Sequence, residues 1–195
     1  MFTPEVATLY PYGTENSVNL HVPQITDTLE GAHRPRHFDG VATVVCKLFN
    51  LVQPDLAVFG QKDFQQLKVI ERMLRDLSLP VRVMAAPTMR ADDGLALSSR
   101  NQYLSTAERG RAPLIHHTLM KMRDLLAKGH AWRALEQVAT AQLIDGGFEP
   151  DYVVIRRAED LAEPAEGEQS GLIALIGARI GTTRLIDNLL ISAEN

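Results

Sequence analysis

The sequence predicts an α/β chain of two domains, a partial parallel α/β domain over residues 1–86 and a small α+β domain over residues 87–195. Two observations predict this class. A strand, a helix and a second strand follow one another before Pro87, and the strands of such a βαβ unit are almost always parallel. Near the end of the chain, two helices precede three strand-like stretches, and a tight turn between the last two favours a small antiparallel sheet.

The composition is that of a globular protein, because 45% of the 195 residues are hydrophobic and 23% are charged. A net charge of −4 gives no general attraction for nucleic acid or anionic lipid. The single cysteine, Cys46, excludes an internal disulfide and suits a reducing compartment. No apolar stretch approaches the roughly 20 residues of a membrane-crossing helix, and the N-terminus lacks a signal-peptide pattern. We therefore expect a cytoplasmic protein with no membrane or nucleic-acid partner.

The first domain begins with an irregular segment and continues with a helix. Prolines and glycines interrupt residues 1–35, although alternating apolar residues predict a short strand over 17–22. Apolar residues spaced by three and four then predict a helix over 38–52, which ends before Pro54.

A single βαβ unit completes the first domain. The apolar run over residues 55–59 predicts a buried strand, Asp63 begins an amphipathic helix, and residues 81–86 predict a second strand. A parallel α/β domain contains several such units, but only one precedes Pro87. The chain therefore reads as though the first part of this domain is missing.

The second domain starts with a polar loop over residues 88–103 and continues with two helices. Ser105 and Glu108 have the spacing of a capping box, which predicts a helix that runs to about Lys128. Another helix is predicted over residues 131–144, where two glycines follow it. Three strands are then expected over residues 150–157, 171–179 and 183–191.

The strongest local signal is the sequence FGQKDFQQ over residues 59–66, because it joins a strand to a helix where open α/β sheets bind ligands. Gly60 allows close approach of the backbone, and the helix N-terminus offers free N–H groups to an anion. Lys62 adds a charge for phosphate, Asp63 can cap the helix or accept from a ribose hydroxyl, and Gln66 lies one turn further on. An ordinary strand–turn–helix with an Asp cap and a solvated lysine explains the pattern equally well.

The polar loop over residues 89–101 carries a second signal. Ser98 and Ser99 are neutral donors and Arg100 is a delocalised charge, a combination that suits a polyphosphate. Gly94 and the polar residues around it leave the loop lightly anchored, so we expect a mobile gate. A plain interdomain loop is the alternative, and composition alone slightly favours it.

Other candidates are weaker. The basic stretch over residues 33–37 is either a surface loop or a contact for an anionic ligand or partner subunit. His116 and His117 point about 100° apart on a helix, so no metal site is predicted there. Cys46 is expected to be a small core residue rather than a nucleophile, and Trp132 is expected to cover a helix–helix seam.

A series of short motifs runs along nearly the whole chain in an order that a known family shares. They are Tyr10-Pro11, Leu29-Glu30-Gly31-Ala32, Arg34-Pro35, His37-Phe38 and Gly40-Val41, followed by residues 47–54, 59–67, 93–101, 103–104 and 184–188. Together they resemble the pantothenate synthetase (pantoate–β-alanine ligase) family. The resemblance implies a Rossmann-like nucleotide-binding domain, similar to that of class I aminoacyl-tRNA synthetases, and a small C-terminal domain.

The resemblance also implies an ATP-dependent ligase of pantothenate and coenzyme A biosynthesis. In that family the pantoate carboxylate attacks the α-phosphate of Mg-ATP, which gives pantoyl adenylate and pyrophosphate, and the β-alanine amine then displaces AMP. The implied partners are pantoate, β-alanine and ATP, with Mg²⁺ carried by the nucleotide, and the implied assembly is a homodimer.

Site residues follow from the same resemblance. Gln66 matches a glutamine that binds pantoate, and Lys62, Ser98, Ser99 and Arg100 are the expected catalytic residues. The expected ATP-binding set is Gly60, Gln61, Lys62, Asp63, Met89, Leu97, Ser98, Ser99 and Arg100.

The chain departs from the family pattern in two ways. The His-x-Gly-His motif of the family occurs nowhere in the 195 residues. Gln61 stands where many members have Glu, and Arg36 and Asp39 stand where Gly and Arg are expected. We therefore expect the C-terminal two-thirds of the enzyme, with half of an ATP site and little activity alone. The alternatives are a non-catalytic module that folds or associates, and another adenylate-forming enzyme of the same fold.

Overall fold

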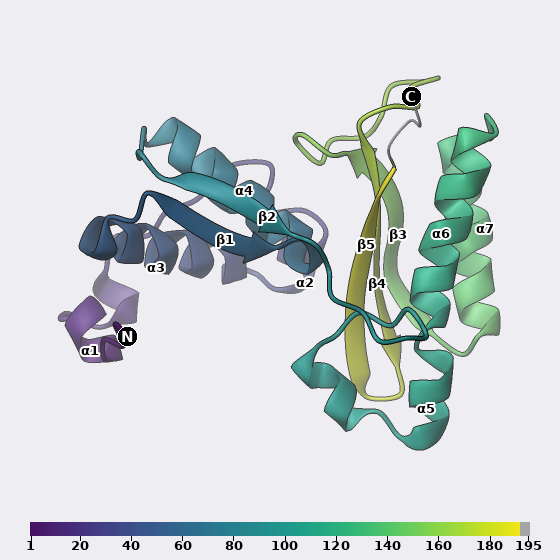
Figure 1. Cartoon of the computed structure of the whole chain (residues 1–195), viewed down its shortest axis with the longest axis horizontal. Helices are drawn as coiled ribbons and strands as arrows, with labels where there is room; N and C mark the ends of the chain where they lie inside the picture. Colours follow the sequence, from purple (N-terminus) through teal and green to yellow (C-terminus); the bar gives the residue numbers. More distant parts are fainter. Residues whose placement is uncertain (192–195) are drawn as a thin grey trace. The chain divides into compact units, whose positions relative to one another are not determined.

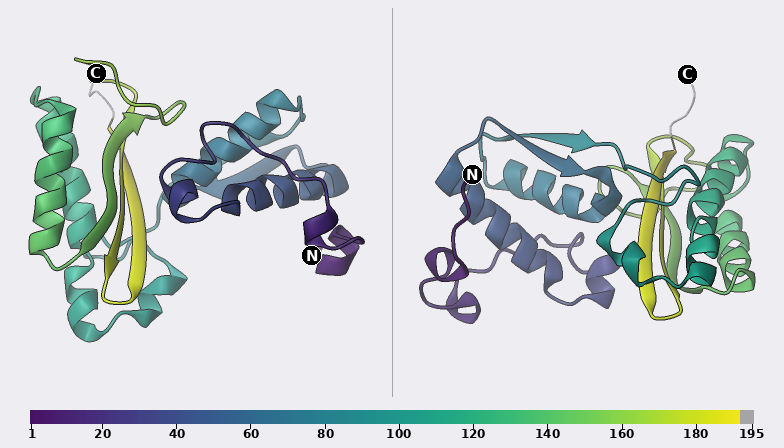
Figure 2. Two further views of the ribbon diagram at one scale, coloured as in Figure 1. Left: turned by 180° about the vertical axis from the view of Figure 1, so that it is seen from behind. Right: turned by 60° about the horizontal axis from the view of Figure 1, so that its bottom comes forward.

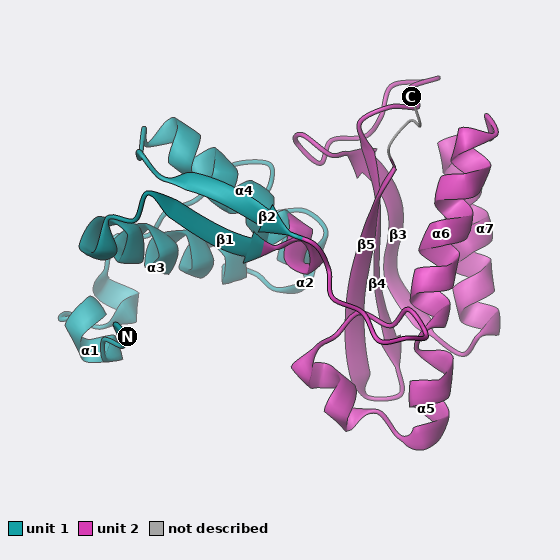
Figure 3. Ribbon diagram, in the orientation of Figure 1, with its two compact units in different colours: residues 1–59, 65–86 teal, residues 60–64, 87–195 magenta. Residues whose placement is uncertain are grey.

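A computed structural model of the chain describes residues 1–191, and these divide into two compact units (Figure 3). The first unit comprises residues 1–59 and 65–86, and the second comprises residues 60–64 and the chain from 87 onward. The segment 60–64 thus belongs to the second unit although both of its flanks belong to the first. The sequence shows no sign of this exchange.

The first unit is a small parallel sheet with two longer helices (Figure 1). Its helices are α1 (Val6–Leu9), α2 (Glu30–His33), α3 (His37–Val52) and α4 (Phe64–Asp76), with a 3₁₀ turn η1 (Thr14–Asn16), and its strands are β1 (Leu56–Gly60) and β2 (Arg82–Ala86). Figure 2 shows α3 and α4 on the same side of the sheet. The predicted helices and the βαβ unit are confirmed.

The strand over residues 55–59 was predicted to be buried, and this is wrong for the part of the chain that the structure describes. Leu56, Val58 and Met84 are 36%, 58% and 50% exposed. Both helices cover one face of the sheet, where Phe59 meets Phe49 edge to face at 6.3 Å. Because side chains alternate along a strand, the residues that point to the other face lose water only if another element covers them.

The strand predicted over residues 17–22 is absent. The alternating pattern of apolar residues in this segment comes from its contact with α3. The segment forms no strand, and the backbone N–H of Leu20 donates to Oγ1 of Thr43 on α3 at 2.8 Å. Val18 is exposed and Val22 is buried. The alternation therefore reflects a chain that lies along a helix, not beside another strand.

The second unit is an antiparallel sheet covered by helices. The helices are α5 (Thr106–Arg111), α6 (Leu114–Ala127) and α7 (Trp132–Asp145), the 3₁₀ turns are η2 (Gln61–Asp63) and η3 (Ser99–Tyr103), and the strands are β3 (Glu149–Arg157), β4 (Leu172–Ile180) and β5 (Thr183–Ile191). The strand order is β3-β4-β5, and α6 and α7 pack on this sheet side by side (Figure 1). The predicted α+β module is confirmed.

The helix predicted from Ser105 to about Lys128 is two helices. Its start is as expected, since Oγ of Ser105 accepts from the N–H of Glu108 and the Glu108 carboxylate accepts from the N–H of Ser105. The chain breaks at Pro113, which has no N–H for a continuing helix and caps α6 instead. Among residues 1–191, no helix has both the length and the apolar character needed to cross a bilayer.

Candidate active site

The turn that carries Lys62 is held from β5. Nδ2 of Asn188 donates to the carbonyl oxygens of Gln61 and Lys62, at 3.0 and 2.8 Å. The half-buried Lys62 forms no ion pair with any residue that the structure describes. The ammonium group is therefore free to meet an anion. Asp63, the last residue of η2, is exposed.

The loop after β2 is a small folded hairpin rather than a loose segment. Its two sides meet at the bridge between Arg90 and Ala96, and the N–H of Leu97 donates to the carbonyl of Met89 at 2.9 Å. Gly94 has φ +90°, and a Cβ there would lie 2.5 Å from Cδ2 of His116. The loop is thus anchored more firmly than its polar composition suggests.

An ion pair between the partly buried Arg90 and the buried Asp187 ties this hairpin to β5. Arg90 donates to both carboxylate oxygens of Asp187, Nη1 to Oδ2 at 2.6 Å and Nη2 to Oδ1 at 3.0 Å. Arg90 also donates to the carbonyl oxygens of Gly94 and Asn188, at 3.1 and 3.3 Å. A bidentate pair of this kind fixes direction as well as distance.

The predicted phosphate donors lie at the end of the hairpin. Ser98 precedes η3, and its Oγ accepts from the N–H of Arg100 at 3.3 Å. Ser99 and Arg100 are exposed, and the Arg100 guanidinium has no ion-pair partner among residues 1–191. Asn101 holds the base of the turn by donating to the carbonyl of Ala96 at 3.0 Å. The donors are therefore presented on an ordered support.

The electrostatics of the hairpin come from its neighbours on α5 and α6. The hydrogen bond from Arg109 lowers the pKa of Asp93, which therefore stays ionised. Burial lowers the pKa of His116, and the positive charge of Arg90 adds to this effect. His116 is thus a neutral packing partner for Gly94, and its buried Nδ1 has no hydrogen-bond partner among the described residues.

The whole predicted ATP-binding set belongs to the second unit, whereas Gln66 belongs to α4 of the first. Its neighbour Gln65 has a structural role. The Gln65 side chain is buried, accepts from the N–H of Glu30 at 3.0 Å, and donates to the carbonyl oxygens of Ile25 and Thr28, both at 2.7 Å. Gln66 is half-buried.

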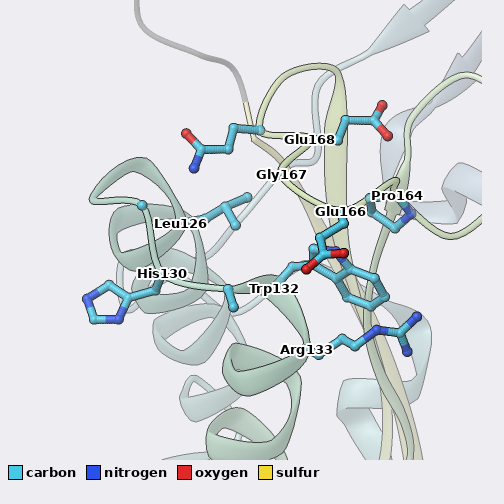
Figure 4. Close-up of a pocket in the computed structure, with 11 residues that line it drawn as sticks. Leu126, His130, Trp132, Arg133, Pro164, Glu166, Gly167 and Glu168 are labelled. Carbon is cyan, nitrogen blue, oxygen red and sulfur yellow. The ribbon is translucent and has the colours of Figure 1, made fainter.

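The remaining candidates take no part in this arrangement. Arg36 lies 3.9 Å from Glu15 on the surface, and Cys46 is half-buried rather than fully in the core. In the described chain, no group of three or more His, Cys, Asp or Glu side chains is placed to hold a metal ion. Trp132 lines a cavity of about 440 Å³ with Arg133, Glu166 and other residues (Figure 4), and the cavity contains none of the predicted site residues.

Sequence reasoning missed Asp187 and Asn188 as functional candidates. Both are buried polar residues between apolar residues in the middle of β5. Asp and Asn are depleted in strands, so their adjacency within β5 was the available signal. Their partners were not predictable, because Arg90 lies 97 positions and Gln61 127 positions away along the chain.

Among the described residues, this α/β chain places a lysine without an ion-pair partner on the turn after a parallel strand, and hydroxyl and guanidinium donors on an ordered hairpin. Such a combination is typical of sites that bind a phosphate-bearing ligand. The family can be stated more closely. The model of the pantoate–beta-alanine ligase family matches residues 1–190, and the chain belongs to that family.

Relatives agree in sequence and in fold. The pantothenate synthetase of Stutzerimonas stutzeri is 53% identical over 192 residues, which are 98% of this chain and 67% of the relative. A crystal structure of the Thermus thermophilus enzyme has a TM-score of 0.90 and 42% identity, covering 98% of this chain and 69% of that one. The pantoate–beta-alanine ligase of Francisella tularensis, complexed with beta-gamma ATP and beta-alanine, has a TM-score of 0.70 and 27% identity, covering 95% and 62%. The chain thus spans about two thirds of the S. stutzeri enzyme.

Proposed function

We propose that this chain carries the C-terminal part of a pantoate–β-alanine ligase, which joins pantoate to β-alanine at the expense of ATP. The observation that carries the proposal is the family match over residues 1–190. The Francisella tularensis ligase that was solved with an ATP ligand and β-alanine supports the same substrate classes. The finer steps below rest on how the residues of the second unit could act on a nucleotide.

In the proposed reaction, a pantoate carboxylate oxygen attacks the α-phosphorus of ATP and pyrophosphate leaves. The β-alanine amine then attacks the acyl carbon of pantoyl adenylate, and AMP leaves with the electrons of the broken C–O bond. No covalent enzyme intermediate is needed, so the protein positions reactants and stabilises charge on phosphate oxygens. Lys62 supplies a point charge, Ser98 and Ser99 supply neutral donors, and Arg100 supplies a forked cation.

The other proposed roles concern the ligands and the assembly. Gln66 binds pantoate, and the exposed Met89 lies near the adenine. Leu97, which is also exposed, belongs with Ser98–Arg100 to the loop that closes on the phosphates. Mg²⁺ arrives bound to the phosphates of ATP and neutralises part of their charge. We place the reaction in the cytoplasm and the enzyme in a homodimer, as the family resemblance implies.

The 195-residue chain alone is proposed to be a poor catalyst. It has no His-x-Gly-His sequence, and the loss of one transition-state donor costs about 3 kcal/mol in enzymes of comparable logic. The competing hypothesis is a non-catalytic module that folds or associates, and one observation favours it. Leu56, Val58 and Met84 present apolar surface on one face of the first sheet, and such surface promotes association.

The test is AMP release from ATP, pantoate and β-alanine. It compares the 195-residue chain with a fusion that adds the remaining N-terminal third of the Stutzerimonas stutzeri relative. We expect AMP only from the fusion, dependent on pantoate, and lost in its Lys62→Ala variant. Equal rates from both proteins would disprove the poor activity of the chain alone. No AMP from either, or AMP that depends on another carboxylate, would overturn the ligase.

A further inference from the structure

The side chain of Asn188 has an unusual task for a residue in a strand. It is buried, with 6% of the residue exposed, and both of its carbonyl partners, Gln61 and Lys62, belong to one turn. A side-chain amide has two N–H donors. The Asn188 amide therefore donates to two successive carbonyl oxygens, which fixes the backbone of the turn. The Lys62 side chain takes no part in these two hydrogen bonds.

Asp187, the residue before Asn188, holds the hairpin that carries the other predicted phosphate donors. Successive side chains of a strand point to opposite faces, so Asp187 and Asn188 reach in opposite directions from one point of β5. Asp187 takes the bidentate contact from Arg90, and Arg90 also reaches the carbonyl of Gly94 within the hairpin. Both η2 and η3 pack against β5.

The two anchors are linked through the backbone of Asn188. The N–H of Asn188 donates to Oδ1 of Asp187 at 2.8 Å, and its carbonyl oxygen accepts from Nη2 of Arg90 at 3.3 Å. β5 is an edge strand of the sheet β3-β4-β5. Since unpaired groups of an edge strand need other partners, these bonds fix the backbone at the point from which both side chains project.

We propose that Asn188 is a positioning residue that acts through Lys62: it holds the Gln61–Lys62 turn on β5, while the neighbouring Asp187 holds the hairpin that leads to Arg100 on the same strand. This inference rests on the proposed function, because it assigns Lys62 to a nucleotide phosphate. Asn188 touches no substrate. Its contribution is the direction of the Lys62 ammonium relative to donors that share the same support.

The test is a double-mutant cycle on MgATP affinity, measured by titration calorimetry with the 195-residue chain. We expect Asn188→Ala to weaken MgATP binding about tenfold, or about 1.4 kcal/mol, because a misdirected Lys62 ammonium loses part of its charge-assisted contact with a phosphate. In the Lys62→Ala background, Asn188→Ala should have no further effect, because residues that act as a unit are not additive. Equal weakening in both backgrounds, or none in either, would overturn the proposal.

Arg184→Ala provides the matched control. Arg184 lies on the same strand and pairs with Asp151 at 2.6 Å, and both side chains are mostly buried. The ion pair that its loss removes joins β5 to Asp151 on β3, so MgATP affinity should stay at the wild-type value. Weakening by this variant to the extent of Asn188→Ala would mean general loosening of β5 and would contradict the proposal.

A second readout separates this inference from the proposed function. If the wild-type chain does not bind MgATP, the nucleotide assignment fails, but the positioning role is still tested by amide hydrogen exchange. Asn188→Ala should speed exchange across residues 60–64 about tenfold and leave α7 unchanged; unchanged exchange at residues 60–64 would overturn it. Asn188→Ser keeps one donor and should give an intermediate increase, and it replaces the alanine variant if that protein does not fold.

Discussion

The sheet of the first unit is open on one face, whereas the sheet of the second unit is covered. Along β4 every residue except Arg179 is buried, and α6 and α7 pack over the strands. Along β1 and β2, every second residue is exposed or nearly so. The second unit therefore builds its core from its own helices and strands. The first unit buries only the helix side of its sheet within the described residues.

This difference matters for the candidate site. The predicted ATP-binding residues belong to the self-covered unit, where Asp187 and Asn188 hold them on a buried strand. Gln66, the predicted pantoate residue, belongs to the open unit. We therefore expect the phosphate-binding arrangement to survive conditions that loosen the first unit.

The largest effect on the free energy of unfolding should come from a substitution in the core of the second unit, compared with one on the open face of the first. Leu119 on α6 is fully buried, so Leu119→Ala should lower the free energy of unfolding of the second unit by about 2–5 kcal/mol. Val58→Ala on the open face should cost no more than about 0.5 kcal/mol. Urea denaturation followed by fluorescence reports the second unit, because Trp132 is the only tryptophan; far-UV circular dichroism reports both units. Equal costs would mean that the open face is covered in solution.

A smaller effect should come from the hairpin. Gly94→Ala places a methyl group against the His116 ring at a positive φ, which should cost about 2–4 kcal/mol. Gly129→Ala is the matched control, because Gly129 has φ +85° and nothing within 4 Å of the added Cβ. Its cost should be about 1 kcal/mol, from the backbone alone. Equal losses in Trp132-monitored denaturation would show that the hairpin is not packed against α6.

The smallest effect is a pH dependence of opposite sign in the two units. In the first unit, the hydrogen bond with Asp39 raises the pKa of His21, so its stabilising effect is full below about pH 6.5 and is lost as the pH rises through the higher folded value. In the second unit, burial lowers the pKa of His116, so stability is full above about pH 6.5 and is lost as the pH falls toward the lower folded value.

Acidification from pH 7 toward pH 5.5 should therefore weaken the second unit and strengthen the first. Hydrogen exchange in each unit, corrected for the intrinsic pH dependence of exchange, measures this. His21→Gln and His116→Gln should each remove the trend from one unit only. A trend of the same sign in both wild-type units would contradict the assignment.

Much of the fold was predictable because it depends on local patterns. Periodicity located α3, α4, α7 and all five strands, and the Ser105–Glu108 spacing located the start of α5. The false strand over residues 17–22 and the supposed burial of β1 have a common cause. Strand formation and burial both depend on which elements lie beside the segment, and the alternation of apolar and polar residues does not specify these neighbours.

The exposed residues of the candidate site were predictable from the sequence, but the buried residues that hold them in place were not. Lys62 and Ser98–Arg100 stand out in the sequence because of their residue types beside a turn. Asp187 and Asn188 act through partners that only the folded chain brings near. In the structure, the missing side chain of Gly94 allows close packing with His116, whereas the mobile gate stays a prediction.

The segment 60–64 has a consequence for how the chain can be divided or recombined. A fragment that begins at Pro87 would contain Asn188 but not the two carbonyl groups that it holds. A crossover between two homologous genes at the same position would join a Lys62 turn from one parent to a β5 from the other. The second unit is thus inherited intact only when residues 60–64 and the chain from Pro87 come from one parent. A cut at a single point in the sequence therefore does not separate the two units.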